Sequence, residues 1–226
     1  MFDAVIFDFD GVIADTEPLH YQAFREVLAA HGVDLSETDY FAKYVGLNDA
    51  TFIRRIFEDR RKPLPDPQEI RSRKDADYES LIARGLPLLP GVRSFVETAA
   101  RSVPLAICSG ARRSEIISLL RQHELEQFFS AIVATEDVPI SKPDPAGFLR
   151  ALELLRKQKT DLTADRCLVI EDSLLGIRAA RAAGMPVLAV LGPIDHPSRT
   201  KADQRTSEAG MSCKNLNDAR AMELVS

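Results

Sequence analysis

The stretch FDAVIFDFDGV, residues 2–12, places two aspartates and a glycine directly after a short apolar run. A short run with almost no polar residue, followed by turn residues, is typical of a strand that is buried on both faces of a sheet. We therefore expect a strand within Phe2–Phe9. Such a strand would carry the carboxylates of Asp8 and Asp10 to its carboxyl end.

The residues that follow this strand indicate helices. Thr16 and Pro18 favour a helix start, because proline is well tolerated in the first helical turn. Apolar residues then recur at helical spacing, and further helices are expected after Asn48 and after Asp66. No convincing strand is predicted between residues 16 and 84.

The pattern changes near Leu88, beyond which short apolar runs alternate with amphipathic segments. This alternation predicts an α/β fold, in which helices cover both faces of a parallel sheet. We expect an α/β domain formed by residues 1–15 and 89–226, interrupted by an all-helical insert at residues 16–88. The tail after Gly192 is polar and weakly patterned. Strands are expected over 103–108, 131–134, 167–170 and 186–190, and helices over 112–123, 144–155 and 174–183.

The charge and hydropathy of the sequence argue against nucleic acids and membranes as binding partners. The net charge of −5 leaves no basic excess to neutralise a nucleic-acid backbone, so we expect no nucleic-acid partner. No apolar stretch approaches the roughly 18 residues that span a bilayer, and no leader-like segment precedes the first strand. We therefore expect a cytoplasmic protein without membrane contact. We also expect a monomer, although no sequence feature bears on the oligomeric state. The three cysteines lack paired spacing, which argues against disulfides or a zinc site, and Cys108 and Cys167 lie in apolar runs and are expected to be buried free thiols.

Polar residues follow the carboxyl ends of four predicted strands. The first strand ends at Asp8 and Asp10, and the next ends at Ser109-Gly110. Lys142 follows the third strand, and Glu171-Asp172 follow the fourth. Ligands bind beyond the carboxyl ends of the strands in open parallel sheets. We therefore expect all these side chains to meet at one edge of the sheet.

These residue types suit a divalent cation and a phosphate. Clustered carboxylates repel each other in a partly desolvated site, so they require a cation, and carboxylate oxygens are ligands that Mg²⁺ prefers. Ser109 and the backbone at the start of the next helix can donate hydrogen bonds to a phosphate, and Lys142 supplies a compact positive charge. The candidate metal ligands are Asp8, Asp10, Glu171 and Asp172.

Four ordered motifs carry a family resemblance: Asp8-Phe9-Asp10-Gly11-Val12, Ser109, Lys142-Pro143 and Glu171-Asp172-Ser173. They resemble the motifs of the haloacid dehalogenase superfamily, and the likeness covers nearly the whole chain. More closely, the chain is similar to the phosphatase and β-phosphoglucomutase branch, which has a helical cap inserted after the first motif. The resemblance implies a Rossmann-like parallel sheet core, an all-helical cap domain, Mg²⁺ as cofactor and a small phosphorylated metabolite as substrate.

The same resemblance implies roles for the motif residues. Asp8 would attack phosphorus and form an aspartyl-phosphate, while Asp10 would protonate the leaving oxygen and then accept a proton from water. The Asp8 side chain, the Asp10 backbone carbonyl and Asp172 would hold Mg²⁺, and Glu171 would bind it directly or through water. The residues that would bind the phosphoryl group are Ser109, Gly110 and Lys142.

Residues outside the motifs are candidates for substrate contact. His20 matches a histidine of the mutase branch, although packing within the helical insert explains it equally well. Arg112 would contact a second phosphate or a carboxylate, or it is a solvated residue at a helix start. Gly46 and Asn48 lie where caps of this branch carry a specificity loop. Asp49 stands where the mutase branch has an arginine, which counts against mutase activity.

The leading prediction is a phosphatase, a phosphoric monoester hydrolase that acts on a sugar phosphate or similar metabolite. A phosphohexomutase would use the same Asp8 chemistry but return the phosphate to the sugar. A haloacid dehalogenase proper needs neither metal nor a second acid, so Asp10 and Glu171-Asp172 argue against it. A non-catalytic phospho-switch also uses an acidic cluster, a hydroxyl and a lysine. Its phosphorylated aspartate lies on a later strand, however, and it has no helical insert.

Overall fold

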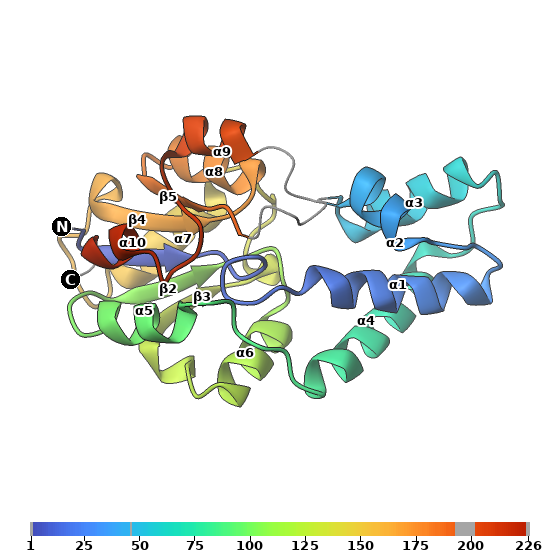
Figure 1. Ribbon diagram of the computed structural model, residues 1–226, viewed down its shortest axis with the longest axis horizontal. Coiled ribbons are helices and arrows are strands. Elements are labelled where there is room, and N and C mark those ends of the chain that lie inside the picture. The colour runs from blue at the N-terminus through green and yellow to red at the C-terminus, as the bar shows by residue number, and fades with distance from the viewer. Residues whose placement is uncertain (1, 46, 193–201, 225–226) are drawn as a thin grey trace. The chain divides into compact units, whose positions relative to one another are not determined.

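The computed structural model describes residues 2–45, 47–192 and 202–224 (Figure 1). Contacts within the chain divide it into two compact units, one formed by Met1–Asp15 with Leu86–Ser226 and the other by Thr16–Gly85. The first unit contains the sheet. In the second unit, all regular structure among the described residues is helical.

A six-stranded sheet forms the frame of the first unit, and every neighbouring pair of strands is parallel. The strand order is β3-β2-β1-β4-β5-β6, so the chain begins in the middle of the sheet, builds one half and then builds the other. The predicted α/β fold class with a parallel sheet is therefore confirmed. The strands are β1 (Ala4–Phe7), β2 (Leu105–Cys108), β3 (Phe129–Val133), β4 (Cys167–Glu171), β5 (Val187–Val190) and β6 (Gly210–Cys213).

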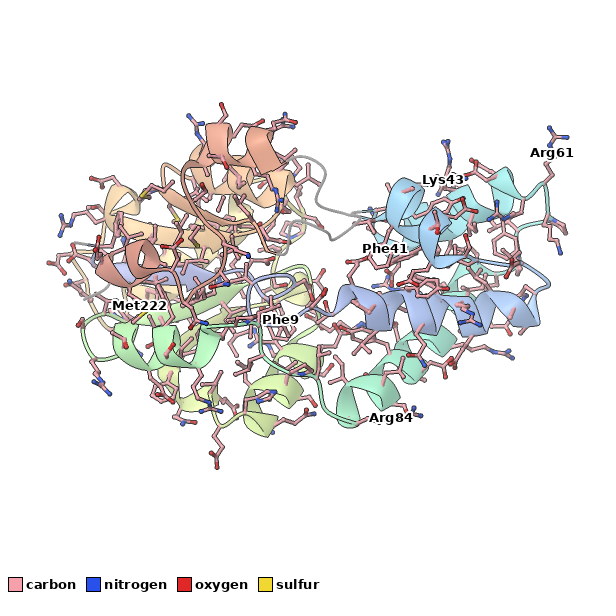
Figure 2. All side chains as sticks on the ribbon, in the orientation of Figure 1. Phe9, Phe41, Lys43, Arg61, Arg84 and Met222 are labelled. Carbon is pink, nitrogen blue, oxygen red and sulfur yellow. The ribbon has the colours of Figure 1, made fainter. Side chains whose placement is uncertain are left out.

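One face of the sheet packs against α5 (Val92–Ala99) and α6 (Arg113–Gln122) (Figure 1). Successive side chains of a strand point to opposite faces, and Val5 and Phe7 of β1 belong to this layer. Phe9, just beyond β1, is fully buried in the same layer (Figure 2). The stretch that carries Asp8 is therefore anchored on both sides by buried aromatic rings.

The other face packs against α7 (Ala146–Leu155) and α8 (Leu174–Ala182). Ala4 and Ile6 of β1 point into this second layer. Because β1 is covered on both faces, all four of its residues are buried, which explains its continuous apolar run. Cys108 and Cys167 are buried free thiols, as expected from the sequence, and so is Cys213.

The helical unit has a hydrophobic core of its own. Side chains of Ser36, Asn48 and Asp66 accept hydrogen bonds from the first turns of the helices that follow them, which defines where these helices begin. Phe41 is buried in this core (Figure 2). Across the described parts of both units, no helix is long and apolar enough to cross a membrane. The elements are α1 (Glu17–Ala30), α2 (Glu37–Asp39), a π-helical turn (Tyr40–Tyr44), α3 (Asp49–Asp59) and α4 (Pro67–Ala83).

The C-terminal segment is more ordered than its sequence suggests. It contains α9 (Ala202–Ala209), β6 and α10 (Ala219–Glu223), and Met222 of α10 packs against the α5–α6 layer (Figure 2). Strand β6 lies at the edge of the sheet and pairs only with β5. An edge strand of four residues needs no continuous apolar run, so sequence periodicity did not reveal it. Helix α5, with eight residues, is likewise too short to stand out.

The central strand provides a test of this packing. Phe7 is fully buried and makes edge-to-face contacts with Phe95 and Phe129, at ring-centroid distances of 5.8 and 5.6 Å. We expect Phe7→Ala to lower the free energy of unfolding by about 3–5 kcal/mol, because it leaves a cavity in the core. Leu149→Ala, at a position that is 45% exposed, should change it by less than about 1 kcal/mol. Urea denaturation followed by circular dichroism measures both, and equal effects of the two variants would contradict the assignment.

Candidate active site

The carboxyl ends of β1 and β4 lie side by side where the strand order reverses. From β1 the chain builds β2 and β3 on one side, while β4, β5 and β6 lie on the other. Loops that leave a sheet on either side of such a point diverge, which creates room for a ligand. Asp8 directly follows β1, and Glu171 is the last residue of β4. Two of the predicted site residues are therefore neighbours at this point.

Lys142 joins these two strand ends. Its Nζ donates hydrogen bonds to Asp8 Oδ1 and to Glu171 Oε1, each at 2.7 Å. The side chains of Lys142, Asp8 and Glu171 are only 18%, 9% and 0% exposed, so water screens these charges weakly. The loop that follows β3 thus contributes to the same site as β1 and β4.

Both carboxylate oxygens of Glu171 have hydrogen-bond partners. Oε1 accepts from Lys142, and Oε2 accepts from the backbone nitrogen of Ser173 at 2.7 Å and from its hydroxyl at 3.0 Å. Gly176 provides the space for this carboxylate, because a Cβ at position 176 would lie 1.6 Å from Glu171 Oε1. The first turn of α8 therefore holds Glu171, and Glu171 in turn holds Lys142.

Asp172 adds a third carboxylate to the site. Asp8, Glu171 and Asp172 each offer a carboxylate oxygen within 4.8 Å of the other two. Gly11 allows this approach, because a Cβ there would lie 2.2 Å from Asp172 Oδ2 and because its φ of +74° favours glycine. Three carboxylates beside one lysine leave an excess of negative charge. With their hard oxygen donors, these residues fit a Mg²⁺ ion.

The electrostatics of the cluster follow from its burial. Burial raises the pKa of Asp8 to about 7, Lys142 opposes this shift, and the carboxylates of Glu171 and Asp10 add to it. Although burial disfavours a charged lysine, attraction to Asp8 and Glu171 holds the pKa of Lys142 well above its usual value. Lys142 is therefore protonated. Its charge alone does not bring the pKa of Asp8 back to the usual value, so a further positive charge would help Asp8 to remain ionised.

Ser109 lies at the same edge of the sheet, directly after β2. Its backbone N–H donates to the carbonyl of Val133 at 3.0 Å, and its Oγ accepts from the backbone N–H of Ala111 at 3.1 Å. A hydroxyl that accepts one hydrogen bond keeps its own proton for donation to another group. Arg112 caps α6, and Glu115 accepts from its backbone N–H at 3.1 Å. Because β2 pairs with β1, Ser109 lies one strand away from Asp8.

The model of the haloacid dehalogenase-like hydrolase family matches residues 5–190. This chain belongs to that family. It is 31% identical to a phosphorylated carbohydrates phosphatase of Thermotoga maritima, over 81% of this chain and 82% of the relative. It is 33% identical to fructose-1-phosphate phosphatase YqaB of Escherichia coli strain K12, over 84% of this chain and 96% of the relative. The structure of a CbbY variant from Rhodobacter sphaeroides in complex with xylulose-(1,5)bisphosphate is similar, with a TM-score of 0.83, 26% identity and full coverage of both chains. The resemblance predicted from the four motifs is confirmed.

Three further predicted residues of this haloacid dehalogenase-like hydrolase belong to the helical unit. His20 stacks on Tyr78 with ring centroids 4.1 Å apart, and loss of water around its ring, followed by the charge of Lys74, lowers its pKa well below the usual value. Asn48 caps α3 through a hydrogen bond of 2.9 Å to its first turn. Gly46 lies outside the described residues. Within the unit, His20 and Asn48 thus have structural contacts that do not depend on a substrate.

Asp10 and Gly110 lie in loops at the carboxyl edge of the sheet. Asp10 follows Asp8 by two residues, is half-buried and forms a single β-bridge with Ala14. Gly110 is exposed next to Ser109, and a Cβ there would meet no atom within 4 Å. The structure therefore brings Asp8, Lys142, Glu171 and Asp172 into one cluster and places Asp10, Ser109 and Gly110 along the same edge.

Gly176 is a supporting residue that the sequence analysis missed. It occupies the third position of α8, where glycine is a poor helix former and plays no capping role. A glycine inside a predicted helix was the signal in the sequence that could have identified this position. Its reason, contact with the Glu171 carboxylate, depends on packing that a local pattern does not encode.

We expect Gly176→Ala to reduce hydrolysis of a chromogenic phosphate ester by about tenfold or more, because the new methyl group displaces Glu171 and with it Lys142. Alanine favours the helix but its methyl group would collide with the buried Glu171 carboxylate, so urea denaturation of the same variant separates lost folding from lost activity. Leu175→Ala, at a 42% exposed neighbouring position, serves as the matched control and should keep full activity. Steady-state kinetics test both variants, and a fully active Gly176→Ala enzyme would show that Glu171 need not occupy this position.

Proposed function

We propose that this hydrolase is a Mg²⁺-dependent phosphatase that releases phosphate from a small phosphorylated sugar through an aspartyl-phosphate on Asp8. The observation that carries the proposal is the carboxylate of Asp8, which lies 2.7 Å from Lys142 within a cluster of carboxylates at the carboxyl end of the sheet. The named carbohydrate and fructose 1-phosphate phosphatases among its relatives support this substrate class. The proposal includes a monomeric cytoplasmic enzyme, and the net charge of −5 supports the lack of a nucleic-acid partner.

The acidic cluster supplies the ligands proposed for Mg²⁺. The side chains of Asp8 and Asp172 and the backbone carbonyl of Asp10 would hold the ion, and Glu171 would contact it directly or through water. When bound, the ion offsets the repulsion between carboxylates and the negative charge of the phosphoryl oxygens. Because both oxygens of Glu171 already accept hydrogen bonds, its larger contribution is to hold Lys142 in place.

Asp8 supplies the nucleophile for the first half of the reaction. One of its carboxylate oxygens attacks phosphorus in line, so that a bond between phosphorus and Asp8 forms while the bond to the sugar oxygen breaks. Asp10 donates a proton to the departing oxygen, and the sugar leaves as a neutral alcohol. In the second half, the ionised Asp10 accepts a proton from a water molecule that attacks phosphorus. The bond to Asp8 then breaks, and inorganic phosphate leaves.

Lys142 and Ser109 bind the phosphoryl group in this proposal. The raised pKa of Lys142 keeps its Nζ protonated next to the nucleophile, where it can donate to a phosphoryl oxygen while it restrains Asp8. The Ser109 hydroxyl and the backbone amide of Gly110 are further donors at the start of the loop before α6. These groups stabilise charge on the phosphoryl oxygens and position phosphorus for attack.

We propose that the helical unit acts as the cap domain that selects the substrate. Candidate contacts in it are His20, Gly46 and Asn48, and Arg112 is a candidate in the unit that contains the sheet. The family resemblance is the basis for proposing each of these contacts.

A contact within the helical unit favours a phosphatase over a phosphohexomutase. Lys74, whose side chain is 3% exposed, donates to Asp49 Oδ2 at 3.1 Å. An acidic Asp49 offers no cation for the second phosphate that a bisphosphorylated intermediate carries, and its presence neutralises the lysine beside it. The acidic residue at position 49 therefore supports a phosphatase rather than a phosphohexomutase.

Asp8→Asn keeps the size of the side chain but removes the nucleophilic carboxylate. We expect it to lower Mg²⁺-dependent phosphate release by at least about a thousandfold. The assay is phosphate release from a panel of sugar phosphates that includes fructose 1-phosphate, with EDTA as the metal-free comparison. Asp3→Asn is the matched control, because Asp3 lies beyond the opposite end of β1 and pairs with Lys159 and Arg166. Release by Asp8→Asn at the wild-type rate would refute Asp8 as the nucleophile.

Asp10→Ala tests the acid and base separately from the metal, because the backbone carbonyl of residue 10 is retained. We expect turnover of sugar phosphates to fall about 10²–10⁴-fold. An activated aryl phosphate needs less help in leaving, so it should still phosphorylate Asp8, and the phosphoenzyme should accumulate because no base activates water. Intact-protein mass spectrometry detects the added phosphoryl group. Unchanged turnover, or the absence of a trapped phosphoenzyme together with slow turnover, would assign this role to another residue.

A further inference from the structure

Arg205 is a buried cation in α9 that no motif of the sequence identifies. The residue is only 4% exposed, although arginine is among the residues least often buried. It also lies beyond residues 5–190, the part of the chain that the family model matches. Burial of a guanidinium is costly unless its donors find acceptors, so its contacts indicate what it supports.

The described contacts of Arg205 lead to the carboxyl ends of two central strands. One terminal nitrogen donates to the backbone carbonyl of Asp172 at 2.8 Å, just after β4, and lies 3.5 Å from that of Val190 at the end of β5. The other terminal nitrogen lies 3.4 Å from the carbonyl of Leu191. All three contacts are charge-assisted, and the one with Asp172 is the shortest of them, which makes it the strongest of the three.

The peptide group between Asp172 and Ser173 is therefore held from both sides. Its carbonyl accepts from Arg205, and its N–H donates to Glu171 Oε2 at 2.7 Å. The Asp172 side chain branches from the Cα atom next to this peptide group, and its carboxylate packs against Gly11. Rotation of the peptide would move that carboxylate away from Asp8 and Glu171, so Arg205 restricts the position of an oxygen donor of the acidic cluster.

Helix α9 carries Arg205 and is itself bound to α8 by separate contacts. Arg178 forms two hydrogen bonds with the carboxylate of Glu208, at 2.9 and 2.8 Å, and Arg181 donates to the Glu208 carbonyl at 2.6 Å. Arg178 is 49% exposed, and its described hydrogen bonds do not include Asp172. The attachment of α9 and the support of Asp172 can therefore be perturbed independently.

We propose that Arg205 is a positioning residue for Mg²⁺ binding, which acts by holding the 172–173 peptide so that the Asp172 carboxylate stays in the acidic cluster. This inference rests on the proposed function, in which Asp172 is a Mg²⁺ ligand. It extends the site into the C-terminal segment, which lies outside the four motifs. Groups that orient metal ligands from behind typically change metal affinity by about 10–100-fold when they are removed.

The test compares Mg²⁺ affinity of the full-length protein, measured by isothermal titration calorimetry without substrate. Arg205→Met keeps a flexible apolar stem, shorter than that of arginine, and removes its donors, so we expect its Mg²⁺ dissociation constant to rise by about 10–100-fold. Arg205→Lys retains one donor that can reach the Asp172 carbonyl and should restore part of the loss. Arg178→Gln, which weakens the attachment of α9 alone, should stay within about twofold of the wild type. With saturating Mg²⁺, Arg205→Met should regain most of the wild-type kcat.

Three results would overturn the inference. If Arg205→Met and Arg205→Lys bind Mg²⁺ as tightly as the wild type, Arg205 has no positioning role, whatever their thermal stability. If Arg178→Gln loses as much affinity as Arg205→Met, the effect comes from general loosening of α9. A wild-type protein that binds no Mg²⁺ would overturn the proposed metal site together with this inference, whereas the first two results leave the metal site intact.

Discussion

Lys142 is the residue on which the arrangement of the acidic cluster depends. Three segments that are distant in sequence, the end of β1, the loop after β3 and the end of β4, meet through its two hydrogen bonds of 2.7 Å. Without an opposing charge, burial of the Asp8 carboxylate beside Glu171 would be costly. One lysine does not neutralise the carboxylates of Asp8, Glu171 and Asp172, and this imbalance supports the proposed divalent cation.

The start of α8 serves both the fold and the site. Ser173 caps the helix by accepting a hydrogen bond from the backbone N–H of Gly176 at 3.0 Å, and the same hydroxyl donates to Glu171. The positive end of the helix dipole favours the negative charge of Glu171 at this position. A glycine at position 176 weakens the helix by about 1 kcal/mol relative to alanine, but a larger residue would collide with the carboxylate that holds Lys142. The glycine thus makes α8 less stable than an alanine would, but it leaves the space that the Glu171 carboxylate needs.

The sequence predicts the centre of the fold better than its edge. Strands β1, β2, β4 and β5 are buried on both faces, so their apolar runs are continuous and visible without a structure. Strand β6 borders only β5, and Gly210 and Ser212 interrupt any pattern in it. The residues of the site likewise fall into a group that the sequence predicts and a group that it does not. Charged residues after central parallel strands are expected to meet, whereas Gly176 and Arg205 act through close packing between segments that no local period records.

Asp172 is supported from opposite ends of the chain. Gly11 leaves space for its carboxylate on one side, and Arg205 holds its peptide carbonyl on the other. A carboxylate that is already in position before a cation arrives loses less freedom on binding, so the affinity depends on both supports. The four motifs within residues 5–190 therefore contain the proposed reacting groups but only part of what would position them. Consider two family members with identical motifs, of which only one has a cation in its C-terminal segment that contacts the carbonyl equivalent to that of Asp172. These two proteins would differ in metal affinity.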